Sequence, residues 1–151
     1  THIHGYKDCD VMDAVPGQLN TISKGLLEMG VTSFIPTTLT SSVDQFNKVC
    51  QLIGEEYEGV EGAKVRGIFL EGPYFTQKYK GAQNEIYMKD PFIEELKKWK
   101  DLSKGLVNKI AIAPERDGVE EFIKEAKKIG VHVALGHSDA SYDQAMKAVG
   151  A

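Results

Sequence analysis

Residues 65–75, VRGIFLEGPYF, form a short apolar run that ends in the carboxylate of Glu71 and is broken at once by Gly72 and Pro73. A β-branched and aromatic run followed by a Gly-Pro pair predicts a buried strand and then a loop. Glu71 therefore lies at the carboxyl end of the predicted strand, where a carboxylate withdrawn from water needs a partner such as a metal ion. A glutamate that stays hydrated at the sheet edge explains this stretch equally well. The residues at the other strand ends must therefore distinguish a metal-binding Glu71 from a hydrated one.

The sequence on both sides of this strand alternates between strand and helix patterns. Strands are predicted at the amino terminus and at residues 31–36, 65–71, 106–113 and 131–136. Helices are predicted at residues 16–29, 43–57, 92–102, 119–129 and 142–149, from the spacing of their apolar residues and from their end signals. Because no hairpin signal separates the strands, the pattern predicts parallel strands in an α/β fold.

Two architectures fit this repeat, an open doubly wound sheet and a (β/α)8 barrel of the TIM type. No Gly-x-Gly-x-x-Gly follows the first strand, which disfavours the dinucleotide-binding form of the open sheet. A complete barrel needs eight units and roughly 250 residues, whereas this chain has 151 residues and begins at Thr1, inside a strand pattern. We therefore expect residues 1–151 to be a partial barrel domain of about five β/α units, a piece of a longer protein.

Composition and charge exclude several classes of protein. A content of 42% hydrophobic and 26% charged residues is typical of a globular domain. The net charge of −4 without a basic cluster argues against a nucleic-acid partner, and no apolar run is long enough to cross a membrane. Cys9 and Cys50 lie far apart and match no zinc spacing, which predicts free thiols in a cytoplasmic protein.

Metal-binding residue types gather at the predicted strand ends, which is where a parallel barrel places its active site. In strand order these residues are His2 and His4, Thr37 and Thr38, Glu71, Glu115, and His137. His2 and His4 are two residues apart, so strand alternation places both imidazoles on one face, where they can bind one divalent ion. The alternative is a pair of exposed histidines at a frayed terminus, which the convergence with Glu71 and His137 makes less favourable.

Strand alternation also orients the last predicted strand. His137 shares a face with Val133 and Leu135, whereas His132 points the other way, toward the helices or the bottom of the barrel. We therefore assign no function to His132. Ser138 could orient the site, but its position favours a cap for the following helix.

The charged side chains in the loop after residues 65–75 can be interpreted in two ways. Lys78 and Lys80 lie beside Gly81 and Ala82, where they could meet a phosphate group of a substrate. A solvated loop explains the same residues without a ligand, and we favour that reading.

Several segments together resemble one family. They are THIHG (1–5) with Asp10 and Met12-Asp13, GVTSFIPTT (30–38), GIFLEGPYF (67–75), KGA (80–82), APE (113–115) and LGHSDA (135–140). They occur in the same order in the N-acetylglucosamine-6-phosphate deacetylases of the amidohydrolase superfamily. The LEGP and GHS pieces are specific only in combination. The resemblance implies a metal-dependent (β/α)8 barrel with a small β-sandwich domain built from both termini.

The resemblance also implies a metal centre. Glu71 matches the metal-binding glutamate of the family, and His137 matches the first of two metal-binding histidines. His2 and His4 match a pair that serves a second metal in some members and is absent in others. The implied cofactor is therefore a divalent metal, one ion or two, and Zn, Fe and Mn all accept imidazole with carboxylate.

The resemblance assigns a substrate loop as well. Gly81 and Ala82 match the loop whose backbone meets the sugar, and Gln83 stands where many members have His and some have Gln. The implied partner is a small phosphorylated amino sugar, and the family tends to form homodimers.

The family pattern has parts that would lie beyond Ala151, namely the second metal-binding histidine, the catalytic aspartate, the last barrel strands and the sandwich domain. We therefore assign no catalytic residue within this chain. The parent protein is expected to hydrolyse N-acetylglucosamine-6-phosphate to glucosamine-6-phosphate and acetate, and the isolated chain is expected to be inactive.

Three alternatives stay open at this point. Another metal-dependent amidohydrolase would place Lys or His on strands where this chain has Glu71 alone. A non-catalytic barrel fragment that binds a metal or a phosphosugar would fit if the parent lacked the later His and Asp. A metal-free isomerase barrel explains the repeat but leaves the ligand-type residues at the strand ends unexplained.

Overall fold

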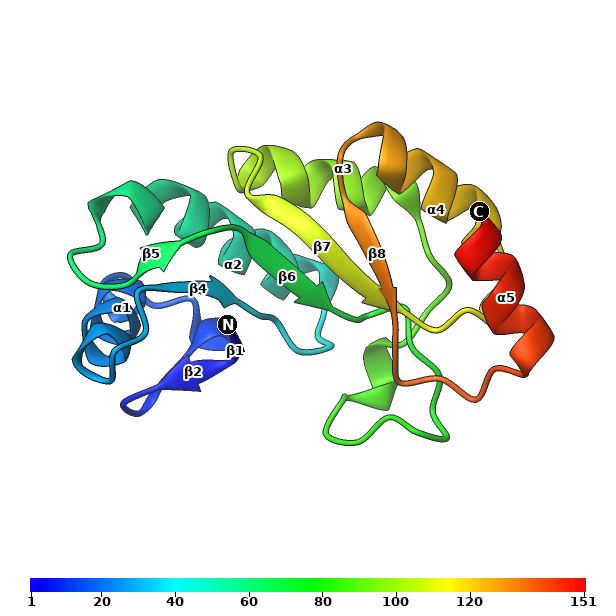
Figure 1. The fold of residues 1–151 in the computed structure, drawn as a ribbon, viewed down its shortest axis with the longest axis horizontal. Coiled ribbons are helices and arrows are strands. Elements are labelled where there is room, and N and C mark those ends of the chain that lie inside the picture. The colour runs from blue at the N-terminus through cyan, green and yellow to red at the C-terminus, as the bar shows by residue number, and fades with distance from the viewer.

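The computed structural model describes residues 1–151 as an α/β fold in which strands and helices alternate along the chain (Figure 1). The strands are β1 (His2–Ile3), β2 (Gly5–Tyr6), β3 (Cys9–Asp10), β4 (Ser33–Pro36), β5 (Lys64–Val65), β6 (Ile68–Glu71), β7 (Val107–Ile112) and β8 (His132–Leu135). The helices are α1 (Gln18–Glu28), α2 (Val43–Glu56), α3 (Ile93–Leu102), α4 (Val119–Lys128) and α5 (Tyr142–Gly150). Short 3-10 turns lie at Val11–Asp13, Tyr57–Gly59 and Glu85–Tyr87. The predicted helices are confirmed to within two residues at each end.

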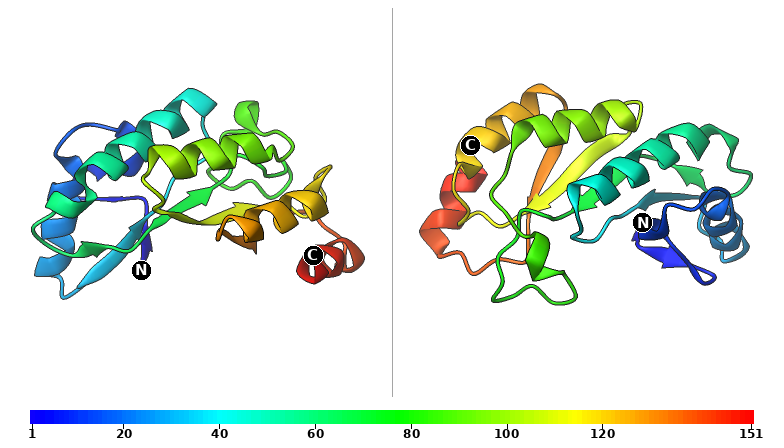
Figure 2. Two further views of the ribbon diagram at one scale, coloured as in Figure 1. Left: turned by 90° about the horizontal axis from the view of Figure 1, so that it is seen from above. Right: turned by 180° about the vertical axis from the view of Figure 1, so that it is seen from behind.

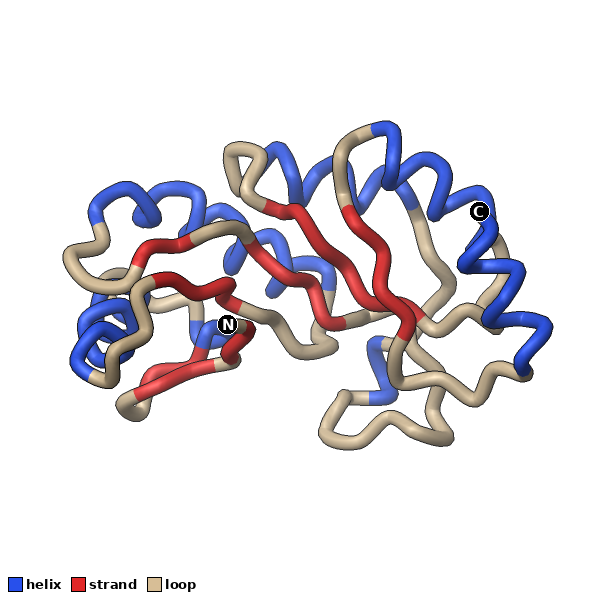
Figure 3. Tube along the Cα trace, viewed as in Figure 1, coloured by secondary structure: helices blue, strands red, loops and turns tan.

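The strands of the main layer follow one another in chain order (Figure 3). They pair in parallel. β4 lies between β1 and β5, and β7 lies between β6 and β8. A parallel bridge between Thr37 and Phe69 joins the two groups, and the Thr38 amide donates to the Phe69 carbonyl at 3.0 Å. The predicted α/β class and parallel pairing are therefore confirmed, and the carboxyl ends of all these strands face the same way.

The predicted strand at 65–71 is divided in two. β5 ends at Val65 and β6 begins at Ile68, with Gly67 at φ 147° between them. Only glycine adopts such a φ readily, and a Cβ on Gly67 would lie 2.1 Å from Nδ2 of Asn108. The break, together with a register shift between Ile68 and Phe69, leaves two three-stranded sheets where the sequence predicts one continuous sheet.

The expectation that the chain has no hairpin is wrong. β2 and β3 pair antiparallel and are joined by Lys7 and Asp8, whose φ values are 53° and 59°. A two-residue turn with both φ values positive matches the right-handed twist of a hairpin. The preferred Asn-Gly or Asp-Gly pair is absent here, so the turn has no strong signal in the sequence. The hairpin packs against α1.

Helices α2, α3 and α4 cover one face of the strands, and α1 and α5 lie at the two ends (Figure 2). The main core lies under these helices, where the Phe46 and Trp99 rings stack at 4.8 Å and the Tyr74 ring meets Phe122 edge to face at 5.3 Å. The opposite face carries only a small apolar cluster around Phe69. The longest helix, α2, has 14 residues, and no helix is long and apolar enough to cross a membrane. Apolar packing on the helix side leaves the other face free for polar groups.

The predicted faces of β8 are reversed. Val133 pairs with Ile110 and packs against the helix-side core, whereas His132 pairs with Lys109, whose Nζ lies 4.5 Å from the centre of the Phe69 ring. Register neighbours in a parallel sheet share a face, so His132 lies on the face opposite the helices. It is nevertheless the first residue of β8, at the opposite end of the strand from His137.

Candidate metal centre

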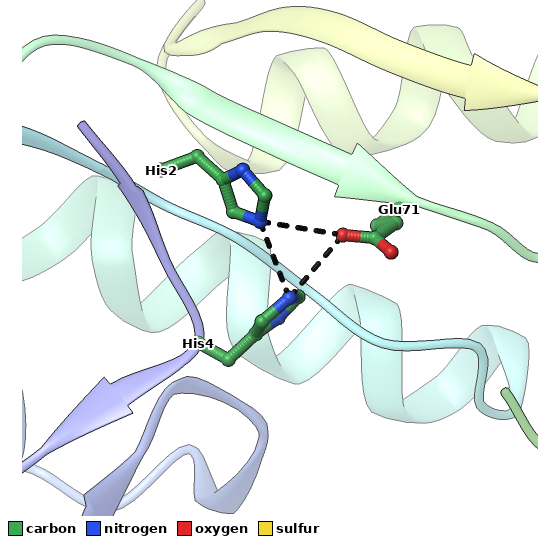
Figure 4. Close-up of side chains that lie close together, drawn as sticks. All are labelled: His2, His4 and Glu71. Carbon is green, nitrogen blue, oxygen red and sulfur yellow. Dashed lines mark hydrogen bonds and ion pairs between the residues drawn. The ribbon is translucent and has the colours of Figure 1, made fainter. Parts of the chain in front are cut away.

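Three ligand atoms from distant parts of the sequence converge at the strand ends (Figure 4). His2 lies on β1, His4 directly follows it, and Glu71 is the last residue of β6. His4 Nε2 lies 3.4 Å from His2 Nε2 and 3.2 Å from Glu71 Oε2, and His2 Nε2 lies 3.6 Å from the same oxygen. Ligands about 2.0–2.1 Å from a tetrahedral ion stand about 3.3 Å apart. The triangle therefore has the size of one face of a tetrahedral coordination sphere.

The ring of His4 is oriented as a ligand. Its Nδ1 lies 3.1 Å from the Thr37 carbonyl oxygen, so Nδ1 carries the proton and donates it. In the neutral ring Nε2 then bears a lone pair, and this lone pair faces Glu71 Oε2. Two lone pairs at this distance repel unless a proton or a cation lies between them. Metal-binding histidines are commonly fixed by the same bond from the other ring nitrogen to a backbone carbonyl.

His137 reaches the same carboxylate from the other side. Its Nε2 lies 2.9 Å from Glu71 Oε1, its Nδ1 lies 3.2 Å from the Tyr79 carbonyl, and its ring packs on Phe75 with a centroid distance of 4.6 Å. The argument that alternation carries His137 to this face is wrong, because Leu135 ends β8 on the helix side. His137 reaches the site because its backbone turns at φ 47° after the strand has ended.

Glu71 is held by side chains from two other loops. Its Oε1 accepts a bond from Gln83 Nε2 at 3.1 Å, and its backbone amide donates to Thr38 Oγ1 at 3.1 Å. Gln83 is 2% exposed, and its own Oε1 accepts from the Thr40 amide at 2.7 Å. Both ends of the Gln83 amide are therefore bonded within the protein, beside the position that the sequence predicts for substrate.

The predicted substrate loop lies over the ligands. A Cβ on Gly81, whose φ is 58°, would stand 3.6 Å from Cε1 of His137, and Ala82 is exposed. The two nearby lysines each have a carboxylate partner, since Lys78 pairs with Asp139 at 2.8 Å and Lys80 pairs with Glu85 at 3.0 Å. These pairs agree with the solvated reading of the lysines.

Glu115 lies apart from the three ligands that form the triangle. Its carboxylate accepts bonds from Thr76 Oγ1 at 2.5 Å, Ser138 Oγ at 2.7 Å and the Asp139 amide at 2.6 Å. Partial burial alone would raise the pKa of Glu115, but these bonds to the charged form outweigh it and hold the pKa below its usual value. The cap of α5 is Ser141, so the expectation that Ser138 caps this helix is wrong.

Sequence reasoning missed the groups that orient the imidazoles. These are the backbone carbonyls of Thr37 and Tyr79 and the hydroxyl of Thr76. Every residue carries a carbonyl, so no residue type marks the two that are used. Thr76 had one signal, since it directly follows the GPYF segment that ends the deciding stretch.

The chain is similar to curated enzymes along its whole length, although no family model matches it. It is 41% identical to the N-acetylglucosamine-6-phosphate deacetylase of Vibrio furnissii, an alignment that covers 100% of this chain and 38% of that protein. It is 35% identical to the enzyme of the same name from Lysinibacillus sphaericus over 98% of this chain and 38% of the relative. It is 36% identical to the N-acetylgalactosamine-6-phosphate deacetylase of Escherichia coli O157:H7 over 95% of this chain and 38% of the relative.

Solved structures give the same result. The N-acetyl-D-glucosamine-6-phosphate deacetylase of Mycobacterium smegmatis superposes with a TM-score of 0.91 at 27% identity, over 99% of this chain and 39% of that one. The enzyme of Pasteurella multocida superposes with a TM-score of 0.82 at 25% identity, over 99% of this chain and 39% of that one. The chain thus spans about 38% of the length of the curated relatives it matches. The resemblance predicted from the sequence is confirmed, and the chain is a homologue of the N-acetylglucosamine-6-phosphate deacetylases across its whole length.

Proposed function

We propose that the whole protein containing this chain hydrolyses the acetamide of N-acetylglucosamine-6-phosphate and releases glucosamine-6-phosphate and acetate. The observation that carries the proposal is the convergence of His2, His4 and Glu71, whose three ligand atoms lie at the spacing of one face of a tetrahedral coordination sphere. The 41% identity to the Vibrio furnissii enzyme over the whole chain supports this choice of reaction.

The chain is proposed to form the first five β/α units of a (β/α)8 barrel. Parallel strands in chain order and ligands gathered at their carboxyl ends support this placement. The remaining strands, the second metal-binding histidine, the catalytic aspartate and the sandwich domain would then belong to the rest of the whole protein. This division explains why the chain matches about 38% of its curated relatives.

The residues fit a divalent cation of the Zn, Fe or Mn type. Glu71 and His137 would hold the primary ion, with the later histidine as a further ligand. His2 and His4 face the other oxygen of Glu71, so they would serve either the same ion or a second one. When bound, such a cation polarises a carbonyl oxygen and lowers the pKa of water from 15.7 toward about 7.

The other residues of the site bind and orient. The backbone at Gly81 and Ala82, with Gln83, would meet the sugar, because this loop lies over His137 and Glu71. The carbonyls of Thr37 and Tyr79 accept from Nδ1 of His4 and of His137, and these bonds direct each Nε2 toward Glu71. Proton transfer from water to the leaving amine is left to the aspartate, because the structure offers no carboxylate in this chain that is free of other partners at the site.

The proposal includes the partners and the location predicted from the sequence. The partner is a small phosphorylated amino sugar, the whole protein forms a homodimer, and the enzyme works in the cytoplasm. Its substrate class includes one close competitor, because one relative is named for N-acetylgalactosamine-6-phosphate. Both sugars therefore belong in the test.

The test is acetate release by the whole protein from each sugar phosphate, with and without a chelator. We expect the glucosamine derivative to be hydrolysed faster, the chelator to stop release, and added Zn, Fe or Mn to restore it. Glu71→Gln replaces an acceptor-only ligand by an amide, and we expect release to fall by about 100-fold or more. The matched control is His132→Asn, at the amino end of β8, which should stay close to wild type.

Two outcomes would contradict the proposal. Near-normal release by Glu71→Gln with metal bound would show that Glu71 is not a ligand. A whole protein that binds metal but releases acetate from neither sugar would favour the alternative of a non-catalytic phosphosugar-binding or metal-binding barrel.

A further inference from the structure

His137 has a backbone conformation that must be held in place. Its φ of 47° is in the left-handed region, which is unfavourable for a residue with a Cβ. It also lies two residues past the end of β8, in the connection to α5. The position of its Nε2 against Glu71 therefore depends on whatever fixes this connection.

Three strand ends meet at Glu115. The residue follows β7, its partner Thr76 follows β6, and Ser138 and Asp139 follow His137. Glu115 Oε1 accepts from Thr76 Oγ1 and from the Asp139 amide, and Oε2 accepts from Ser138 Oγ. The two residues after His137 are thus attached to one carboxylate.

The carbonyl of His137 is attached to the same group from the other side. Thr76 donates to it from its backbone amide at 3.3 Å, and the Thr76 hydroxyl, which donates to Glu115, lies 3.4 Å from the same oxygen. The neighbouring Arg116 donates from Nε and Nη2 to the Phe75 carbonyl at 2.8 and 2.6 Å, and the Phe75 ring packs on the imidazole of His137. The backbone and the ring of His137 therefore both depend on residues 115–116.

We propose that Glu115 is a positioning residue of the metal centre, which holds the backbone of His137 so that its Nε2 stands at Glu71. The inference rests on the proposed metal-dependent function and adds a residue to it. Glu115 acts from outside the triangle of His2, His4 and Glu71, and its two oxygens accept from Thr76, Ser138 and Asp139. An ionised carboxylate suits this place because it only accepts hydrogen bonds.

The chemistry of the bonds predicts a graded response to substitution. Glu115→Ala leaves all three donors without an acceptor. Glu115→Gln keeps an oxygen for Thr76 and the Asp139 amide, and the hydroxyl of Ser138 can rotate to accept from the new NH₂ group. Bonds to a charged acceptor are about twice as strong as neutral ones, so glutamine should restore most of the function but not all of it.

The experiment uses the whole protein, freed of metal and titrated with Co²⁺. We expect Glu115→Ala to weaken cobalt binding by about 10–100-fold, the usual effect of losing a group that orients a ligand, and to change the visible absorption spectrum of the bound cobalt. Glu115→Gln should stay within about threefold of wild type, as a partial rescue. Glu120→Ala, which removes an exposed carboxylate at the start of α4, is the matched control and should change neither quantity.

Thr76→Val provides a second variant for the case that Glu115→Ala does not fold. It removes one donor to Glu115 while it keeps the shape of the side chain, and we expect weaker cobalt binding than in wild type. Wild-type affinity and an unchanged spectrum in Glu115→Ala, or in Thr76→Val if only that variant folds, would overturn the inference. A wild-type protein that binds no cobalt would instead overturn the proposed function, and the inference with it.

Discussion

Glu71 divides its two carboxylate oxygens between different imidazoles. Oε2 faces His2 and His4, and Oε1 faces His137 and accepts from Gln83. A carboxylate that is 13% exposed at its side chain and has imidazole nitrogens on both sides is well suited to bind cations on either oxygen. Whether one ion or two would bind therefore depends on whether the two oxygens of Glu71 share an ion or each bind one.

A substitution of Gln83 distinguishes two possible roles of this residue, contact with substrate and orientation of Glu71. The family resemblance places it at the substrate, whereas its bonds place it between Glu71 and the Thr40 amide. We expect Gln83→Ala to weaken cobalt binding by about 10–100-fold, because Glu71 loses a donor that orients it. It should also lower the free energy of unfolding by about 1–3 kcal/mol, since a buried amide is left without an acceptor.

Cobalt titration and denaturant-induced unfolding of the whole protein measure the two effects, and steady-state kinetics measures KM. Gln77→Ala is the control, because Gln77 is an exposed glutamine of the same loop that bonds only to Glu85. A variant of Gln83 with unchanged cobalt affinity and a raised KM would instead support a direct contact with substrate.

The four side chains of the candidate metal centre could be predicted because they are metal-binding residue types and they stand at strand ends. Histidines and a glutamate that stand at strand ends carry a signal in the sequence, and the structure brings all four together. The face of His137 was not predictable by alternation, because the rule holds within a strand and this residue lies beyond one, at a positive φ. Carbonyls that fix the rings carry no signal at all.

At the scale of elements, α2 and α3 pack closely at Gly54. A Cβ on Gly54 would lie 2.7 Å from the Leu102 carbonyl oxygen and 2.8 Å from Cα of Ser103. Both atoms belong to the backbone, so neither can rotate away. The glycine therefore sets how close the end of α3 comes to α2.

We expect Gly54→Ala to destabilise the whole protein by about 1 kcal/mol. Alanine favours a helix by about 1 kcal/mol over glycine, but overlap with fixed backbone typically costs about 1–3 kcal/mol. Denaturant-induced unfolding measures the difference. Gly59→Ala is the control, since a Cβ there meets nothing within 4 Å, and a Gly54 variant as stable as this control would show that α3 shifts without cost.

The helices could be predicted more closely than the strands. Each helix has apolar residues at helical spacing over several turns and a residue that marks its end. β1, β2, β3 and β5 have two residues each, which is too few for alternation to be seen. The break at Gly67 looks in sequence like an ordinary glycine within a strand. The hairpin at Lys7 and Asp8 uses turn residues that are not the preferred pair.

At the scale of the whole molecule, the proposed function separates the residues that would bind the ion from the residue that would transfer the proton. This chain contributes His2, His4, Glu71 and His137 to one site, but no group assigned to move a proton between water and the leaving amine. It also presents apolar side chains to solvent on α5, namely Tyr142, Met146 and Val149. Exposed apolar side chains gathered on one helix are typical of a surface that is covered in an assembled protein.

The last prediction follows from this separation. Residues 1–151, produced alone, should release no acetate from N-acetylglucosamine-6-phosphate at a concentration at which the whole protein releases it in a chelator-sensitive manner, because the aspartate assigned to proton transfer is not in the chain. Acetate is measured for both at equal molarity, with far-UV circular dichroism as the control that the short chain is helical. Chelator-sensitive release by a helical short chain would show that His2, His4, Glu71 and His137 suffice for turnover. The proton would then have to pass through a group of this chain. Glu71, the one carboxylate among these four residues, would be the first to test.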